Sequence, residues 1–155
     1  MEERKKQSSM EALNEKNWFQ YFSLIKRAYR LDAFINIIDE FENPKEYWEV
    51  LGDLWIDSEN IGEDKKLWKF CLTTGPEKDK EFFMSEEDRD VFRKLPETFK
   101  VYRGYVPRKN KTGLSFTLSK DKADWFANRY KLLFNKGEVL ERTVKHMSSY
   151  DSTFE

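Results

Sequence analysis

The first 95 residues carry apolar side chains at the three- and four-residue spacing of amphipathic helices. Before position 42 these residues are Trp18, Tyr21, Phe22, Ile25, Ala28, Tyr29, Leu31, Phe34, Ile35, Ile38 and Phe41. A second face follows in Tyr47, Trp48, Leu51, Leu54 and Trp55. The helical register of the tryptophans favours burial in a core over a surface that stacks on bases or sugars. We therefore expect residues 1–95 to form a helical accessory region.

Local signals predict where some of these helices begin and end. Asn43-Pro44 is typical of an N-cap with proline at the first helical position. Another helix is expected from about Glu63 to Leu72, closed by Gly75-Pro76. Ser85 with Asp88 resembles a capping box for the last helix of this half.

After Pro96 the pattern changes from helical to strand-like. Phe99–Val106, Gly113–Leu118 and Glu138–Val144 each predict a strand. Between the last two, Ser119 is expected to cap a helix. The apolar positions of that helix are Ala123, Phe126, Ala127 and Tyr130. The fold class expected is α+β, with a helical region over 1–95 and a small mixed β region over 96–155.

Composition supports a folded chain whose net charge is too small to give a strong overall electrostatic field. Aromatic residues make up 16% of the sequence, and 28 basic against 29 acidic residues give a net charge of −1. A local basic patch is possible where five cations lie close together in the sequence. These are Lys100, Arg103, Arg108, Lys109 and Lys111, and for the last three a solvated loop is the favoured interpretation.

Several classes of site are disfavoured by the residues present. The single cysteine, Cys71, lies in an apolar helical pattern and is expected to be a buried structural thiol. With one histidine, His146, soft ligands are too few for zinc, so we expect no metal site. No G-x-G-x-x-G occurs, which argues against a Rossmann unit. The charged start has no signal-peptide core and no apolar run spans a membrane, so we expect a cytoplasmic protein without membrane contact.

The residues that point to chemistry follow Phe99. Arg103 stands in a hydrophobic strand, where a charge is costly unless it is paired or exposed. It either points to solvent or directs its planar fork at a phosphate or carboxylate. Gly104 would let a ligand approach the backbone. On a strand, Ser115 and Thr117 would share one face, as outward polar residues or as the lining of a cleft.

Order and spacing together resemble a known family. Tyr102-Arg103-Gly104 is followed by Gly113-Leu114-Ser115-Phe116-Thr117, and then by a helix containing Lys122-Ala123-Asp124-Trp125-Phe126-Ala127. This series is similar to the R-S-E class of ADP-ribosyltransferases, especially its small phage and bacterial members. The resemblance covers about Leu95 to Glu155 and leaves the helical half unexplained.

The resemblance implies that NAD is the substrate and assigns roles around Arg103. Arg103 would contact an NAD phosphate and the nicotinamide ribose, with Tyr102 and Gly104 beside it in the dinucleotide site. Ser115 would match the family serine that holds the cleft and the catalytic glutamate in place. Thr117 would take the place of the last hydroxyl of that motif.

The same resemblance implies a nicotinamide wall and a catalytic acid. Trp125 would help to wall the nicotinamide pocket, whereas core packing is the expected role of Phe126. The resemblance implies that Glu155 is the catalytic glutamate, with Thr153 two residues before it. Alternatively, Glu155 is the first acid of an E-x-E pair whose catalytic acid is missing. We expect the last strand of the fold to be cut short behind Glu155.

Three functions follow as alternatives. The first is a mono-ADP-ribosyltransferase, a phage or bacterial effector or toxin that modifies a protein or nucleic acid in the bacterial host cytosol. The second is a catalytically inactive binding or inhibitory protein on the same scaffold. The third is a helical interaction module with an incidental β tail. A partner protein that masks the cleft and the oligomeric state are both left open.

Overall fold

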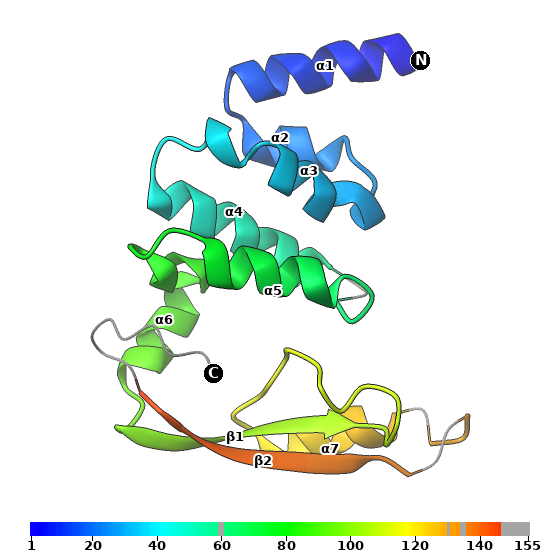
Figure 1. Ribbon diagram of the computed structural model, residues 1–155, viewed down its shortest axis with the longest axis vertical. Helices are drawn as coiled ribbons and strands as arrows, with labels where there is room; N and C mark the ends of the chain where they lie inside the picture. Colours follow the sequence, from blue (N-terminus) through cyan, green and yellow to red (C-terminus); the bar gives the residue numbers. More distant parts are fainter. Residues whose placement is uncertain (59–60, 130, 134–135, 147–155) are drawn as a thin grey trace. The chain divides into compact units, whose positions relative to one another are not determined.

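The computed structural model describes residues 1–58, 61–129, 131–133 and 136–146. It is a mixed helix and sheet structure, which confirms the α+β class. The chain divides into two compact units, Met1–Arg89 and a second that begins at Asp90, so the border falls within helix α6 (Figure 1). The sequence pattern places its border somewhat later, after Leu95.

The first unit is helical throughout its regular elements. In chain order these are α1 Glu2–Asn14, α2 Trp18–Ser23, η1 Arg27–Tyr29, α3 Arg30–Asn36, η2 Ile38–Glu40, α4 Pro44–Asp57, α5 Lys65–Thr74, η3 Lys80–Phe83 and the start of α6 Glu86–Arg93. The Asn43 side chain accepts from the amide of Glu46 at 2.9 Å, and Ser85 accepts from the amide of Asp88 at 3.1 Å. Both predicted N-caps are confirmed. The apolar series from Trp18 to Tyr29 is not one helix, because the backbone at Lys26 is extended.

The core of the first unit is aromatic and is centred on α3, α4 and α5. Its largest fully buried side chains are Phe34, Leu51, Trp68 and Cys71. Trp48 and Trp68 are 2% and 1% exposed, so burial is confirmed for these two tryptophans. The Tyr47 hydroxyl donates to the carbonyl of Cys71 at 2.8 Å. Cys71 is the structural thiol that the sequence indicates, and burial raises its pKa to about 11.

The second unit is a β-hairpin with one helix packed on it. Strand β1 (Thr98–Tyr105) pairs antiparallel with β2 (Glu138–Lys145), in a register that sets Thr98 opposite Lys145. Helix α7 (Lys120–Asn128) is capped by Ser119, whose hydroxyl accepts from the amide of Lys122 at 3.2 Å. In Figure 1 the helix lies against both strands. Three predicted elements are thereby confirmed.

Glycine allows α7 to approach this hairpin closely. A Cβ at Gly104 would lie 1.8 Å from the carbonyl oxygen of Ala123, and one at Gly137 would lie 1.9 Å from that of Ala127. Ala123 and Ala127 are 0% and 1% exposed. Small residues on both sides of the contact therefore set the helix directly on the backbone of the strands.

The strand predicted over 113–118 is wrong. One isolated bridge remains, in which Thr117 and Tyr102 exchange both backbone hydrogen bonds at 2.8 Å. The carbonyl of Ser115 accepts from the Arg103 side chain instead of from a strand. The segment turns at 111–112 and bends at Leu114, so it forms no regular strand ladder beyond this bridge.

Core packing of Phe126 is also wrong, since its side chain is 49% exposed. The alanines at 123 and 127 supply the buried face of α7, and Phe126 lies beside that face. No helix among the described residues is long and apolar enough to span a membrane.

Candidate functional site

Arg103 is the centre of the site that the sequence singles out, and its guanidinium is held by a loop of its own unit. Nε and Nη2 donate to the carbonyl of Asn110 at 3.2 and 2.7 Å, and Nη1 donates to the carbonyl of Ser115 at 2.9 Å. Both acceptors belong to the segment that leaves β1 and returns to Tyr102 through Thr117. The arginine therefore fastens this connecting segment to its strand.

These contacts leave some N–H donors of the guanidinium available to a ligand. Arginine has five N–H donors, and three are used here, so two have no acceptor within the described ranges. Arg103 forms no ion pair with any carboxylate of residues 1–58, 61–129, 131–133 or 136–146. Partial burial lowers its pKa, but a guanidinium stays charged at neutral pH. A half-buried cation with spare donors is suited to an anionic ligand.

Gly113 lets the loop close over Arg103. A Cβ at this position would lie 1.8 Å from Nη2 and 2.2 Å from Cζ of the arginine. The Asn110 side chain accepts from the amide of Val106 at 2.8 Å, which fixes the turn that presents the Asn110 carbonyl. Arg108 within this turn has φ 65°, the left-handed region. The loop is therefore shaped around the guanidinium.

Ser115 and Thr117 reach this site in different ways. Ser115 is exposed and meets Arg103 through its carbonyl, while its hydroxyl has no hydrogen bond within the described residues. The Thr117 hydroxyl accepts from the amide of Ser119 at 3.2 Å, next to the start of α7. Two contacts therefore bring these residues together: the backbone bridge between Tyr102 and Thr117, and the hydrogen bond from the Arg103 guanidinium to the Ser115 carbonyl.

Gly104 and Trp125 belong to the other side of β1. The space beside Gly104 is filled by α7 rather than open to a ligand. Side chains alternate along a strand, so Arg103 points away from the face that α7 covers. Trp125 lies on the side of α7 opposite the buried alanines and is 62% exposed. It is not brought together with Arg103.

Two acids of β2, Glu138 and Glu141, are engaged with β1, and the predicted catalytic acid is not among the described residues. Tyr105 donates its hydroxyl to Glu138 at 2.7 Å, and this hydrogen bond raises the pKa of Tyr105. Lys100 pairs with Glu141 at 3.5 Å. Glu155 and Thr153 lie outside the described ranges.

Sequence reasoning missed Asn110 and Gly113 as partners of Arg103. Gly113 was predicted to begin a strand, whereas an Asn and a Gly in the segment after a strand are typical of a tight turn. The neighbouring cations Arg108, Lys109 and Lys111 are exposed, as a solvated loop predicts. The Lys111 ammonium lies 5.9 Å from the centre of the Tyr105 ring.

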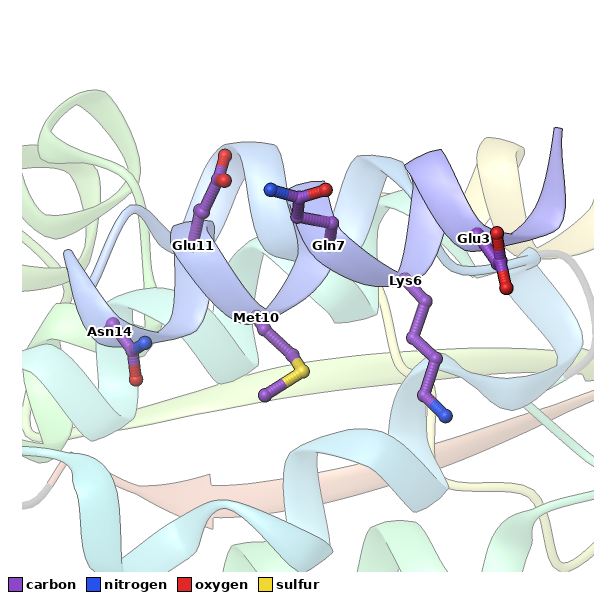
Figure 2. A pocket seen from close by; sticks show the side chains of 6 residues that line it. All are labelled: Glu3, Lys6, Gln7, Met10, Glu11 and Asn14. Atoms are coloured by element: carbon purple, nitrogen blue, oxygen red, sulfur yellow. The ribbon is translucent and has the colours of Figure 1, made fainter.

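A shallow hollow in the first unit offers no comparable chemistry. Figure 2 shows that all its lining side chains come from α1. They are Glu3, Lys6, Gln7, Met10, Glu11 and Asn14. Within the described ranges no group of three or more His, Cys, Asp or Glu side chains could hold a metal ion.

Comparison of the chain with protein-family models, with curated proteins and with solved structures gave no match. The chemistry of the Arg103 site is therefore argued from its own residues.

Proposed function

We propose that the second unit binds NAD and transfers ADP-ribose to a protein or nucleic acid, with Arg103 as the anchor for the dinucleotide. The two spare N–H donors of Arg103 would bind oxygen atoms of the pyrophosphate, for which a planar guanidinium is well suited. The exposed Ser115 hydroxyl would add a neutral donor beside it.

One observation carries this proposal. The hydrogen bond from Arg103 Nη1 to the Ser115 carbonyl joins the aromatic-Arg-Gly strand to the Ser-x-Thr segment twelve residues later. The neighbouring bridge between Tyr102 and Thr117 fixes the same two segments side by side. These are the elements whose order and spacing resemble the R-S-E transferases, and they lie together in space.

The reaction would break the bond between C1′ of the ribose and the nicotinamide nitrogen. Nicotinamide leaves with the electron pair of that bond and becomes neutral, while the acceptor nucleophile bonds to C1′ and releases a proton to a carboxylate or to water. Positive charge develops on the ribose during this step, so a nearby carboxylate would stabilise the transition state. We assign that carboxylate to Glu155, and Arg103 would hold the dinucleotide in place.

Nicotinamide release and label transfer test the proposal. The full chain is incubated with NAD labelled in its adenylate part and with a cell extract, beside Arg103→Lys and Glu155→Gln. Arg93→Lys is the matched control, because Arg93 is an exposed arginine of the same unit that pairs only with Asp90 in the described ranges. We expect transfer by the wild type and by the control, and a loss of about tenfold or more in the other two variants. Transfer that survives both substitutions contradicts the site.

A second candidate is an NAD-binding or inhibitory protein without catalysis. It is favoured by the engagement of three of the arginine's five donors with its own loop, which leaves fewer for a transition state. This candidate predicts that NAD binds to the full chain while no nicotinamide is released.

A further inference from the structure

Charge is divided unevenly between the two units. Residues 1–89 hold 14 lysines and arginines against 21 aspartates and glutamates, a net charge of −7. Residues 90–155 hold 14 against 8, a net charge of +6. The value of −1 for the whole chain conceals this division. A basic unit attracts polyanions, and nucleic acid is the commonest of these in a cell.

The solvent face of α7 joins this positive charge to exposed rings. Lys122, Trp125, Phe126 and Arg129 stand at positions i, i+3, i+4 and i+7 of one helix, so they form a single row. All four side chains are exposed, and Trp125 and Phe126 are 62% and 49% exposed. The Arg129 guanidinium lies 5.3 Å from the centre of the Phe126 ring.

Much of the surface of both rings stays open to solvent, although Phe126 lies beside the buried face of α7. Ala123 and Ala127 alone form the buried face of α7, and Trp125 contacts Phe126 edge to face at 5.0 Å. Burying two such rings would have stabilised the unit, whereas exposing them costs solubility. A surface that carries them is therefore expected to bind something flat and apolar.

Two features of the row select the ligand class. Aromatic rings stack on unpaired bases, and the flanking cations neutralise phosphates. In a duplex the bases are already stacked on one another, so an exposed indole on a helix finds no free base face. A second ring of this unit, Phe116, also carries a cation, the Arg142 guanidinium at 5.5 Å.

We infer that the second unit binds single-stranded nucleic acid through the row Lys122, Trp125, Phe126 and Arg129. The rings stack on bases, and the cations contact the backbone. The inference deepens the proposed function, since it assigns the acceptor to nucleic acid. It rests on that function only for the transfer step, because the binding itself requires no NAD.

The test is a binding titration without NAD. Fluorescein-labelled oligothymidylate and oligouridylate of about 12 nucleotides, and a duplex of equal length, are titrated with the full chain and followed by anisotropy. We expect both single strands to bind more tightly than the duplex. Raising the salt from about 50 to 200 mM should weaken binding roughly tenfold or more.

Matched variants separate stacking from charge. Trp125→Ala should weaken single-strand binding roughly tenfold, and Phe126→Ala should act in the same direction. The control is Phe19→Ala, which removes an 89% exposed ring from the acidic unit and should leave binding unchanged. Both rings of α7 are exposed, so these variants are expected to fold, which circular dichroism checks.

Three outcomes overturn the inference. The first is no binding of either single strand at low salt. The second is equal affinity of Trp125→Ala and the wild type. In the third, polyglutamate binds as tightly as the oligonucleotides, which would assign the surface to an acidic protein. Failure of NAD turnover would leave this titration unaffected, so the two proposals fail independently.

Discussion

The carbonyl of Asn110 accepts two hydrogen bonds from Arg103, at 2.7 Å from Nη2 and 3.2 Å from Nε. A neutral backbone atom thus holds the cation that the family resemblance assigns to an NAD phosphate. The arrangement fastens the loop after β1 and keeps the guanidinium in a defined position. Hydrogen bonds of this kind to a charged donor each contribute about 1.5–3 kcal/mol.

Gly113→Ala is predicted to release the loop from Arg103. The new Cβ would meet the guanidinium at 1.8 Å, so either the arginine or the loop must move. Because the clashing atoms are the far end of a flexible side chain, we expect the guanidinium to shift and to lose hydrogen bonds to the loop, at a cost of about 1–1.5 kcal/mol, which makes loop opening roughly tenfold more frequent. Trypsin should then cut faster after Arg108, Lys109 and Lys111, as measured by mass spectrometry.

The control for this prediction is Gly62→Ala, where an added Cβ meets no atom within 4 Å. Cleavage after Lys78, in the other unit, provides the internal reference rate. If Gly113→Ala and Gly62→Ala are cut at the same rate in the loop, Arg103 does not fasten it.

Gly104→Ala is predicted to displace α7 from the hairpin. Its Cβ would lie 1.8 Å from the carbonyl of Ala123 and 2.6 Å from the amide nitrogen of Ala127. Both contacts are with backbone, which cannot rotate aside, so we expect a loss of about 3 kcal/mol in the free energy of unfolding. Urea denaturation measures the loss. A change below about 0.5 kcal/mol would show that α7 does not pack on Gly104.

Alkaline pH is predicted to destabilise the first unit through Cys71. Burial raises the pKa of Cys71 from its ordinary value of about 9.0 to about 11, so the unfolded chain loses this proton first. The contribution is therefore intact below pH 9 and falls as the pH rises towards 11. At pH 10 the loss of folding stability that comes from this thiol amounts to about 1.4 kcal/mol. Urea unfolding of the wild type at pH 8 and pH 10 measures the change.

The matched variant is Cys71→Ala, which has no thiol to titrate. Its loss of stability between pH 8 and pH 10 should be smaller than that of the wild type by about the same 1.4 kcal/mol. An equal loss in the two proteins would mean that the thiol is not protected from ionisation in the fold.

Short sequence motifs correctly predicted the helix caps and the strands of the hairpin, because these features depend on interactions between nearby residues. Asn43, Ser85 and Ser119 cap helices where their sequences indicate, and the two strands of the hairpin lie within a residue or so of their predicted ends. Trp48 is buried because its helical register places it on the core face of α4. These features depend on neighbours a few positions away in the sequence.

The Arg103 site depends on contacts that the spacing of apolar residues along the sequence cannot predict. Over 113–118 the expected strand is replaced by a bent segment that meets β1 at one bridge, and its Ser115 carbonyl accepts from the Arg103 side chain. Phe126 was assigned to the core because helical spacing cannot tell that two alanines suffice for close packing on Gly104. The charge division was present in the sequence but disappears when one net value is taken for the chain.

The central claim is that Arg103 anchors NAD, and calorimetric titration of the full chain with NAD tests it most directly. The account predicts that the wild type and Arg93→Lys bind NAD with equal affinity. Arg103→Lys keeps the charge but loses the planar fork, so it should bind about tenfold or more weakly. No binding by the wild type, or the same affinity in Arg103→Lys, would contradict the account.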